Sequence, residues 1–492
     1  MQSNGGLTDA RRFQGKDAIL SGPAGGVVGA VETATKAGFG KVIGFDMGGT
    51  STDVTHYDGE YERAFETQVA GVRMRAPMMR INTVAAGGGS MLFFDGARYR
   101  VGPESAGANP GPACYRRGGP LCVTDANVMT GKIQPDFFPK VFGPNGDQKL
   151  DGEVVRRKFA AVAGEIKKKT GDARAPAEVA EGYLKIAVEN MANAIKQISV
   201  QRGRDVTEYT LNCFGGAGGQ HACLVADALG MTTVYIHPLA GVLSAFGMGL
   251  ADLRVMRERA VEATLADSAL PKVSKVLDEL GEEGLKEMRR QGVPDRRIEV
   301  LRRVLVRYAG TDTPMLVDFG ARAQIVKAFE TAHQQQWGFF MPEKEHVIEA
   351  ASVEVVGHGD PVVEPAPPAA GKSNPAALAQ VAMFTEGVEH RTPVYDRDHL
   401  KPGNVVDGPA IVVDRNATTV VEPGWRAEVT ERDHLVLRRV GAKRRQAAIG
   451  TTVDPVMLEV FNNLFMSIAE QMGVTLGNTA YSVNIKERLD YS

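Results

Sequence analysis

The order of apolar and polar positions in the first half of the chain predicts alternating strands and helices. Short β-branched and aromatic runs bounded by glycine are typical of buried strands, and apolar residues every three or four positions are typical of helices. The predicted strands cover residues 41–45, 54–57, 210–214 and 233–236. The predicted helices cover residues 151–170, 177–201 and 222–229. Because a strand, a glycine-rich turn, a helix and a strand follow one another from residue 210, we expect an α/β core.

The pattern changes after residue 260, so we assign residues 1–260 to a first unit. Residues 261–362 begin with a highly charged helical pattern and continue as a mixture of helix and strand. Residues 363–380 are rich in Pro and Ala, which is typical of a semi-rigid linker. Residues 381–442 alternate short apolar runs with turns, which predicts a small β-rich domain. Residues 451–492 contain an apolar helix with little of its own domain to bury against.

Composition excludes several classes of protein. The 492 residues carry 57 Lys and Arg against 59 Asp and Glu, so no basic field favours nucleic acid or anionic lipid as a partner. No uncharged apolar run is long enough to span a membrane, and the first residues lack the layout of a secretory signal. The four cysteines form no Cys-x-x-Cys pair. We therefore expect a reduced, soluble, cytoplasmic protein.

The segment Asp46–Asp53 (Asp-Met-Gly-Gly-Thr-Ser-Thr-Asp) is the strongest candidate for chemistry. It joins two predicted strands, and its two glycines, Gly48 and Gly49, let backbone N–H groups approach an anion closely. The residues that add hydroxyl donors are Thr50, Ser51 and Thr52. The two terminal acids can hold a hydrated Mg²⁺, which prefers carboxylate and water oxygens. An ordinary tight hairpin is the alternative, and we favour phosphate binding.

A second glycine-rich turn, Phe214–His221, lies between a predicted strand and a predicted helix. Its candidate nucleotide-facing residues are Gly215, Gly216 and Gly218. His221 stands where a dinucleotide site requires its third glycine, so a Rossmann motif is not formed. Close packing of helix on strand is an equally good interpretation of these glycines. Packing or capping is likewise as good an interpretation of His221 as contact with a ligand.

The remaining motif is a pair of irregular Gly- and Pro-rich stretches, residues 85–90 and 102–115, which are typical of functional loops. Gly87 and Gly88 are candidate cofactor-binding residues within the first stretch. Asp125 follows these loops, and it is a candidate metal ligand or, more often at such a position, a helix N-cap. No His-rich spacing typical of a transition-metal site occurs.

Together these segments resemble the hydantoinase/oxoprolinase family. The matching segments, in the same order as in the family, begin at Ser21, Phe45, Val84, Gly102, Gly111, Thr124 and Phe214. The segment 307–314 (Arg-Tyr-Ala-Gly-Thr-Asp-Thr-Pro) is similar to the 5-oxoprolinase branch of that family. Two terminal segments, 454–461 and 484–490, are similar to the opening of the family's B-type domain.

The resemblance implies a fold. It implies an actin-like and Hsp70-like ATPase lobe with a ribonuclease H-like core, followed by an α+β region and a small β-rich C-terminal domain. In that superfamily two lobes close on ATP, and the hairpin at Asp46–Asp53 resembles that of the second lobe. Because only about 45 residues precede this hairpin, we expect a piece of a longer enzyme that lacks its first lobe and most of its B-type part.

The resemblance also implies an activity: ATP-driven hydrolysis of 5-oxo-L-proline or a related cyclic amide, with Mg²⁺. Asp46 and Asp53 would be catalytic, and Asp46 and Asp125 would hold the metal. The phosphates would lie on the Asp46–Asp53 turn and near Gly87 and Gly88, with the adenosine on the turn at Gly215. The expected partners are a small-molecule substrate, a B-type domain in the same chain and further copies of the chain. A hydantoinase or acetone-carboxylase-type subunit, a small-molecule kinase and a non-catalytic fragment stay open as alternatives.

Overall fold

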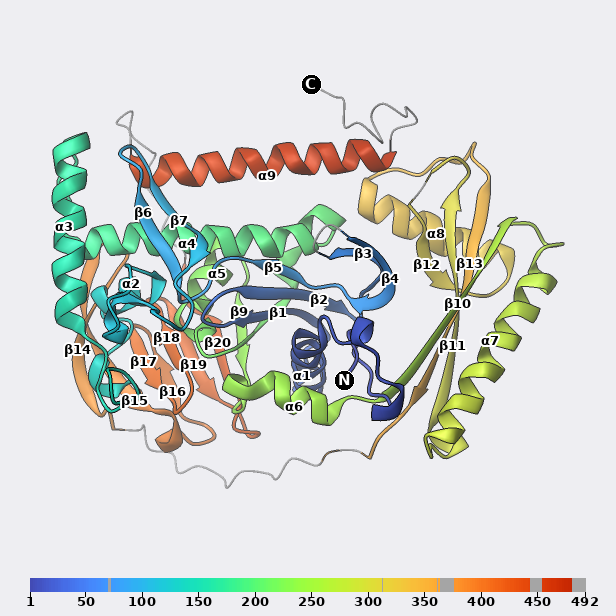
Figure 1. Cartoon of the computed structure of the whole chain (residues 1–492), viewed down its shortest axis with the longest axis horizontal. Helices are drawn as coiled ribbons and strands as arrows, with labels where there is room; N and C mark the ends of the chain where they lie inside the picture. The colour runs from blue at the N-terminus through green and yellow to red at the C-terminus, as the bar shows by residue number, and fades with distance from the viewer. Residues whose placement is uncertain (70–71, 312, 361, 363–375, 443–453, 480–492) are drawn as a thin grey trace.

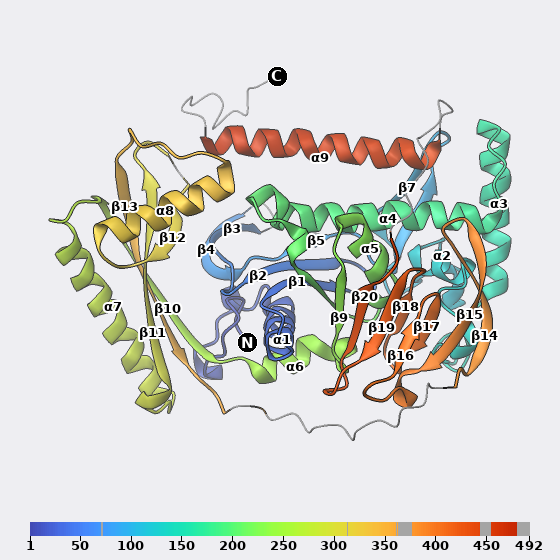
Figure 2. The ribbon, with the colours of Figure 1, turned by 180° about the vertical axis from the view of Figure 1, so that it is seen from behind.

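The computed structural model describes residues 1–69, 72–311, 313–360, 362, 376–442 and 454–479, and it forms two packed units (Figures 1 and 2). The larger unit is built on an eight-stranded sheet, and the smaller unit is built on a four-stranded sheet. Most of the predicted linker lies outside the described residues, and so does the second terminal segment, 484–490. The mixed α/β class predicted from the sequence is confirmed.

Five consecutive strands form one end of the large sheet, with β5 at its edge. They are β1 (Lys41–Met47), β2 (Thr52–Asp58), β5 (Asn82–Val84), β8 (Thr210–Phe214) and β9 (Thr233–Ile236). Their order is β5-β2-β1-β8-β9, with β1 antiparallel to β2 and parallel to β8. A three-stranded antiparallel meander continued by parallel strands is the topology that the ribonuclease H-like expectation requires.

The large sheet continues beyond β9 with strands from the C-terminal part of the chain. These strands are β20 (Leu435–Arg439), β19 (Trp425–Val429) and β16 (Val405–Asp407). Because β20 pairs with β9, Leu437 and Trp425 are buried in the same core as Ile43. The expectation of a separate β-rich domain at residues 381–442 is therefore corrected, since pairing satisfies the backbone groups that an edge at β9 would expose.

The rest of that segment forms a second, four-stranded sheet beside the large one. Its strands are β14 (Ala379–Thr385), β15 (Val388–Asp396), β17 (Ala410–Val413) and β18 (Thr418–Val421), in the order β14-β15-β17-β18. The short turn between β17 and β18 lies close to the glycine-rich turn after β8: a Cβ on Gly219 would lie 2.7 Å from the carbonyl oxygen of Thr418.

Helices cover both faces of the large sheet (Figure 1). One face carries α1 (Ser21–Lys36) and α6 (Leu243–Leu250). The other face carries α4 (Pro176–Ile198) and, packed against it, α2 (Val123–Met129), α3 (Gly152–Thr170) and α5 (Ala222–Leu229). The helical spacing predicted around Tyr183 is confirmed, because the predicted apolar positions of α4 are buried.

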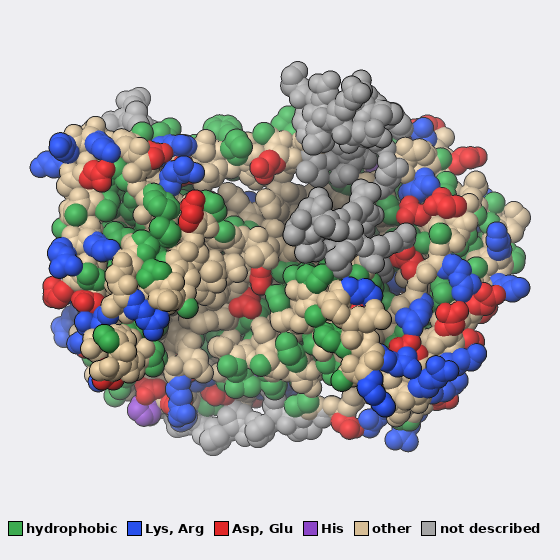
Figure 3. Space-filling view, viewed as in Figure 1, with side chains coloured by type: hydrophobic (Ala, Val, Ile, Leu, Met, Phe, Trp, Pro, Cys, Tyr) green, Lys and Arg blue, Asp and Glu red, His purple; other side chains and the backbone are tan. Residues whose placement is uncertain are grey.

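The smaller unit has its own apolar core. Its strands are β10 (Leu253–Thr264), β11 (Ile298–Tyr308), β12 (Met315–Asp318) and β13 (His346–Gly357), in the order β10-β13-β11-β12. Its helices are α7 (Leu270–Arg290) and α8 (Arg322–Trp337). The inner face of α7 buries Leu277 and Met288, and charged side chains of both signs crowd its outer face (Figure 3).

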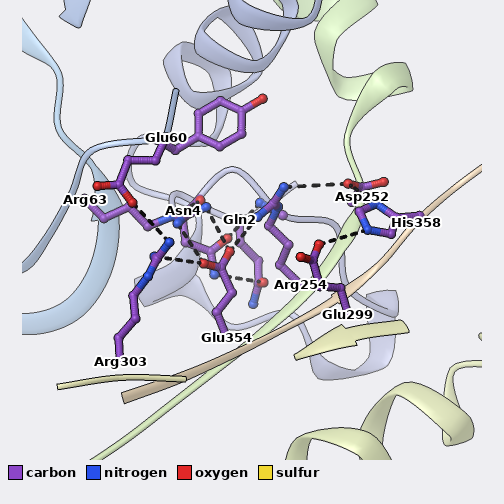
Figure 4. A network of polar contacts seen from close by, with 12 residues as sticks. Gln2, Asn4, Glu60, Arg63, Asp252, Arg254, Glu299, Arg303, Glu354 and His358 are labelled. Atoms are coloured by element: carbon purple, nitrogen blue, oxygen red, sulfur yellow. Dashed lines mark hydrogen bonds and ion pairs between the residues drawn. The ribbon is translucent and has the colours of Figure 1, made fainter. Parts of the chain in front are cut away.

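Ion pairs join the two units (Figure 4). Glu354 of β13 is 4% exposed and pairs with Arg254 of β10 at 2.5 Å and with Arg63 at 3.1 Å. Arg63 begins β3 (Arg63–Val69), which forms a hairpin with β4 (Val72–Met79) in the larger unit. Burial opposes ionisation of Glu354, but the two guanidinium groups outweigh it and hold its pKa below the ordinary value.

Two further elements lie over α4. One is the hairpin of β6 (Ser90–Phe94) and β7 (Tyr99–Ser105), and the other is the helix α9 (Pro455–Thr479) (Figure 1). The inner face of α9 packs on α4 through Val456, whereas Phe465 and Met472 on its other face are 66% and 68% exposed. No helix within the described residues combines the length and apolarity that a membrane span requires.

Candidate functional site

The predicted hairpin forms as expected from the sequence. Strands β1 and β2 pair in antiparallel register, with Asp46 directly opposite Asp53 and Met47 opposite Thr52. Phe45 and Met47 are fully buried, so the strand is anchored in the core on both sides of Asp46. The two strands turn through Gly48–Ser51, where Gly48 N–H donates to the carbonyl oxygen of Ser51 at 3.1 Å.

The tip of this hairpin presents free backbone donors. Gly49 and Thr50 are exposed, and within the described residues neither N–H donates to a protein acceptor. A Cβ on Gly48 or Gly49 would meet nothing within 4 Å, so there is open space on the side of the turn that these two positions face. Exposed N–H groups without a competing partner are the donors that a phosphate oxygen requires. The prediction that Gly48, Gly49, Thr50 and Ser51 bind phosphate is therefore compatible with their positions.

Other predicted phosphate ligands instead support the hairpin from beneath. Gly88 N–H donates to the carbonyl oxygen of Gly48 at 3.1 Å, and Thr52 Oγ1 donates to that of Ala86 at 2.5 Å. A Cβ on Gly87 would lie 2.5 Å from the carbonyl carbon of Thr50, so only glycine fits there. Because Thr52, Gly87 and Gly88 are all buried, the expectation that they contact a cofactor is corrected.

The fold disfavours ionisation of both acids of the hairpin. Burial and the neighbouring carboxylate of Asp53 raise the pKa of Asp46 to about 6. Burial also raises the pKa of Asp53, against a hydrogen bond that its carboxylate accepts from Thr83 Oγ1 at 2.6 Å. A bound cation lowers the free-energy cost of ionising two carboxylates that face each other. This arrangement favours a divalent cation beside the free amides of the turn.

Mg²⁺ fits this donor set, since it is commonly held by one or two carboxylates, substrate phosphates and water. Within the described residues, no group of three or more His, Cys, Asp or Glu side chains is placed to hold a metal without such additional ligands. Asp46 and Asp53 are therefore the protein groups that would hold Mg²⁺ in the presence of a nucleotide.

Asp125, the other predicted metal ligand, has a different role. Its carboxylate is fully buried and accepts hydrogen bonds from the N–H groups of Ala113, Cys114 and Cys122 at 2.8–2.9 Å. These bonds attach the preceding loop to the start of α2. Because both carboxylate oxygens are engaged by the backbone, the expectation of a metal ligand at Asp125 is corrected, and a role in holding the helix start replaces it.

The second glycine-rich turn lies directly beside the hairpin. Gly215 has a φ of +81°, and a Cβ there would lie 2.4 Å from both Asp46 Oδ1 and the carbonyl oxygen of Met47. Ala217 N–H donates to that same Met47 oxygen at 3.1 Å. Gly216 is exposed, whereas Gly218 is buried, with the position of its Cβ 2.8 Å from Cys213 Sγ. Gly215 and Gly216 can thus face a ligand, and Gly218 is a packing residue.

His221 belongs to the interior. It is 1% exposed, and its Nε2 lies 3.1 Å from Asn127 Nδ2, which also donates to Gln220 Oε1 at 2.9 Å. Burial and the nearby Lys132 lower the pKa of His221 to about 3, so its ring is neutral at pH 7. Of the two interpretations left open by the sequence, the structure therefore supports packing, here between α2 and α5.

Ser244 is a site residue that the sequence analysis did not identify. Its Oγ donates to Asp46 Oδ2 at 3.3 Å. Ser244 reaches Asp46 because α6 crosses α1 at glycines: a Cβ on Gly25 or Gly29 would lie within 2.7 Å of α6 backbone oxygens. The glycines of the segment at Ser21 were the available signal, but their partner helix cannot be identified from local sequence.

A cavity of about 530 Å³ lies elsewhere, between the two units. Glu60, Arg202 and Arg303 are among its lining residues, and it adjoins the end of β2 opposite to the hairpin. Arg202 is paired with Glu62, and Arg303 with Glu60. This cavity is therefore separate from the predicted phosphate site.

Comparison with known proteins places this geometry in a family. Residues 1–257 match Hydantoinase/oxoprolinase, residues 261–440 match its C-terminal domain, and residues 454–492 match Hydantoinase B/oxoprolinase. The whole chain is 42% identical to 5-oxoprolinase 1 of Arabidopsis thaliana and 38% identical to 5-oxoprolinase of Dictyostelium discoideum. It spans about 40% of the length of each of these relatives.

A solved structure supports the same assignment. The ATP-dependent caprolactamase of Pseudomonas jessenii superimposes with a TM-score of 0.80 at 28% identity, over 89% of this chain and 64% of that one. A match over 89% of the chain at this TM-score shows that most of the fold is shared. The chain therefore belongs to the hydantoinase/oxoprolinase family.

Proposed function

We propose that this chain is the ATP-using part of a 5-oxoprolinase, which hydrolyses 5-oxo-L-proline to L-glutamate while ATP is cleaved to ADP and phosphate. The observation that carries the proposal is the exposed turn at Gly49 and Thr50, whose free N–H groups adjoin the paired acids Asp46 and Asp53. The 42% identity to a 5-oxoprolinase over the whole chain supports the choice of substrate.

The chemistry explains why ATP is needed. A lactam carbonyl is a poor electrophile, because the ring nitrogen donates its electron pair to it. Transfer of the γ-phosphoryl group to the lactam oxygen creates a leaving group and makes the ring carbon open to attack by water. Water then adds to that carbon, and the ring C–N bond breaks with protonation of nitrogen, which leaves an acyl phosphate. A second water hydrolyses the acyl phosphate to the carboxylate of glutamate and free phosphate.

The residues of the hairpin would contribute placement and charge. The N–H groups of Gly49 and Thr50 would bind phosphate oxygens, and Gly215 and Gly216 would leave room for the nucleoside beside them. Asp46, held by Ser244, and Asp53 would bind Mg²⁺, which neutralises phosphate charge during transfer. Fixed donors that face a developing charge are among the largest contributions to catalysis.

The helix α9 suggests where a second part would join. It lies in the segment that matches Hydantoinase B/oxoprolinase, and its outer apolar face is exposed. We assign that face to contact with the B-type part of the same protein, which would complete the hydrolysis. In this arrangement, α9 connects the two parts by packing on α4 with its inner face.

The test is Asp46→Asn in a purified protein that comprises at least residues 1–492 and the B-type part. We expect 5-oxoproline-dependent release of ADP and glutamate to fall by about 100-fold or more, because cation placement is lost. Asp267→Asn, at an exposed acid outside the site, is the matched control and should retain full activity. Wild-type turnover in Asp46→Asn would contradict the proposal.

A second candidate is the same chemistry on another cyclic amide. The similarity to the Pseudomonas jessenii caprolactamase favours it. Assays with 5-oxo-L-proline, hydantoin, caprolactam and acetone, each with ATP–Mg²⁺, decide between the substrates. If kcat/KM for caprolactam or hydantoin exceeds that for 5-oxo-L-proline by a factor of ten or more, that compound replaces 5-oxo-L-proline as the proposed substrate. A stable phosphorylated product would indicate a kinase instead.

A further inference from the structure

A narrow cavity of about 60 Å³ lies on the far side of the glycine-rich turn from the hairpin. Two backbone segments form most of its wall: residues 236–242, after β9, and residues from 412 to 419, at the turn between β17 and β18. A volume of this size holds a few water-sized groups. It therefore suits the polar edge of a planar ring, with the rest of the ring outside.

Short contacts connect this cavity to the hairpin. Gly215, which touches Asp46, donates its N–H to the carbonyl oxygen of Ala240 at 3.0 Å. A Cβ on Gly216 would lie 3.3 Å from the carbonyl oxygen of Asn416, and one on Gly241 would lie 2.7 Å from Asn416 Cβ. Gly216 and Gly241 carry no side chains that could block this path. A molecule that extends from the hairpin across exposed Gly216 therefore reaches Asn416.

We propose that the turn Asp414–Ala417 is the adenine-recognition surface of the nucleotide site, with Asp414 and Asn416 as the residues that select the base. This inference rests on the proposed function, because it requires the triphosphate to lie on the hairpin at Gly49. It adds a second contact region, contributed by the C-terminal part of the chain rather than by either glycine-rich motif.

The side chains of the turn suit adenine. Asp414 lines the cavity, and its carboxylate accepts hydrogen bonds from the N–H groups of Arg415 and Asn416. A carboxylate has about four acceptor positions, so two remain, and when ionised it only accepts: it favours the exocyclic amino group of adenine and repels the exocyclic oxygen of guanine. Asn416 is exposed, and its carboxamide can both donate and accept hydrogen bonds.

The other polar groups of the cavity are engaged elsewhere. The guanidinium of Arg397 donates to Asp433 Oδ1 at 2.9 Å and to the carbonyl oxygen of Leu400 at 3.4 Å. His237 Nδ1 accepts from Leu239 N–H at 3.1 Å, and burial lowers the pKa of His237 to about 4, which keeps the ring neutral. Asp414 and Asn416 are thus the groups best placed to distinguish one base from another.

The test measures binding of three probes by calorimetry to the protein defined above: ATP–Mg²⁺, GTP–Mg²⁺ and tripolyphosphate–Mg²⁺. We expect the wild type to bind ATP at least about tenfold more tightly than GTP, since guanine would place its exocyclic oxygen against the acceptor-only carboxylate of Asp414. Asp414→Asn should reduce the ratio of ATP affinity to GTP affinity by about tenfold. Asn416→Ala should weaken the binding of ATP. Neither variant should change the affinity for tripolyphosphate, which has no base.

The outcomes separate this inference from the proposed function. An unchanged ratio of ATP to GTP affinity in Asp414→Asn, with unchanged ATP affinity in Asn416→Ala, overturns the inference alone. An equal loss of affinity for ATP and for tripolyphosphate also overturns the inference, because the substitutions would then act through the hairpin. If the wild type binds neither ATP nor tripolyphosphate, the proposed function fails first. Asp267→Asn and thermal melting of every variant exclude effects of misfolding.

Discussion

At the scale of single residues, the ionisation of Asp46 affects the stability of the folded protein. Its pKa in the folded protein is about 6, above the ordinary value of 3.8, so the fold favours its protonated form. Ionisation of Asp46 therefore reduces stability as pH rises from 3.8 to 6, and the loss is complete above that window. A shift of this size corresponds to at most about 3 kcal/mol. Strain of this kind is common where function requires a buried charge.

Asp46→Asn should consequently stabilise the protein at pH 7. The amide carries no charge to bury, so we expect the free energy of unfolding to rise by up to about 3 kcal/mol at pH 7. Near pH 3.5 the gain should vanish, because wild-type Asp46 is then protonated in both states. Urea unfolding at both pH values measures the difference. Equal stabilisation at both pH values would show that the carboxylate is not strained.

The same pKa predicts how nucleotide binding depends on pH. If ionised Asp46 binds the cation of ATP–Mg²⁺, affinity should fall as pH decreases through about 6. Asp53→Asn removes one cause of the raised pKa, so the midpoint should move to lower pH, although affinity at pH 7 also decreases. Calorimetric titration between pH 5 and 8 reports both effects. A midpoint that stays near 6 in Asp53→Asn would assign the titration to another group.

At the scale of elements, the glycines of the site divide into those that face a ligand and those that support the hairpin. The sequence predicted the hairpin itself, because alternating apolar residues and a Gly-Gly turn are local signals. It could not distinguish Gly49, in open space, from Gly87, whose Cβ would meet Thr50. That difference arises from contact between segments almost forty residues apart. Asp125 was assigned to a metal from the family resemblance, whereas its position in the sequence favoured the start of a helix, and its carboxylate does hold the start of α2 to the preceding loop.

Two alanine substitutions test this division. Gly87→Ala should displace the hairpin, lower stability by about 1–3 kcal/mol and weaken ATP binding. Gly49→Ala has space for its methyl group and no positive φ, so it should fold normally and weaken only ATP binding. Chemical unfolding and calorimetry measure the two effects. Gly164→Ala, in open space within α3, is the control and should be neutral or slightly stabilising. Normal ATP binding by Gly49→Ala would place the phosphates elsewhere.

At the scale of the whole molecule, the large sheet is assembled from both ends of the described chain. The sequence predicted the strands at residues 381–442 but not their destination. Leu437 of β20 is paired with Val234 of β9, about two hundred residues earlier, and no local pattern records such a pairing. The smaller unit is thus an insertion between parts of one sheet. This topology also brings Asp414 and Asn416 to the glycine-rich turn.

A shared sheet makes a prediction about cooperativity. Leu437 is fully buried, so Leu437→Ala should lower the free energy of unfolding by about 2–5 kcal/mol. The fluorescence of Trp425, which is 1% exposed in the same core, measures this unfolding. A Trp337→Phe background removes the other tryptophan of the chain. Leu378→Ala, at a residue 46% exposed, is the matched control and should change little.

Because β20 completes the sheet that carries the hairpin, unfolding followed by Trp425 should coincide with loss of ATP binding. If Trp425 unfolds first while ATP binding persists, residues 381–442 behave as an independent domain, and both the shared core and the base-recognition surface lose their structural basis.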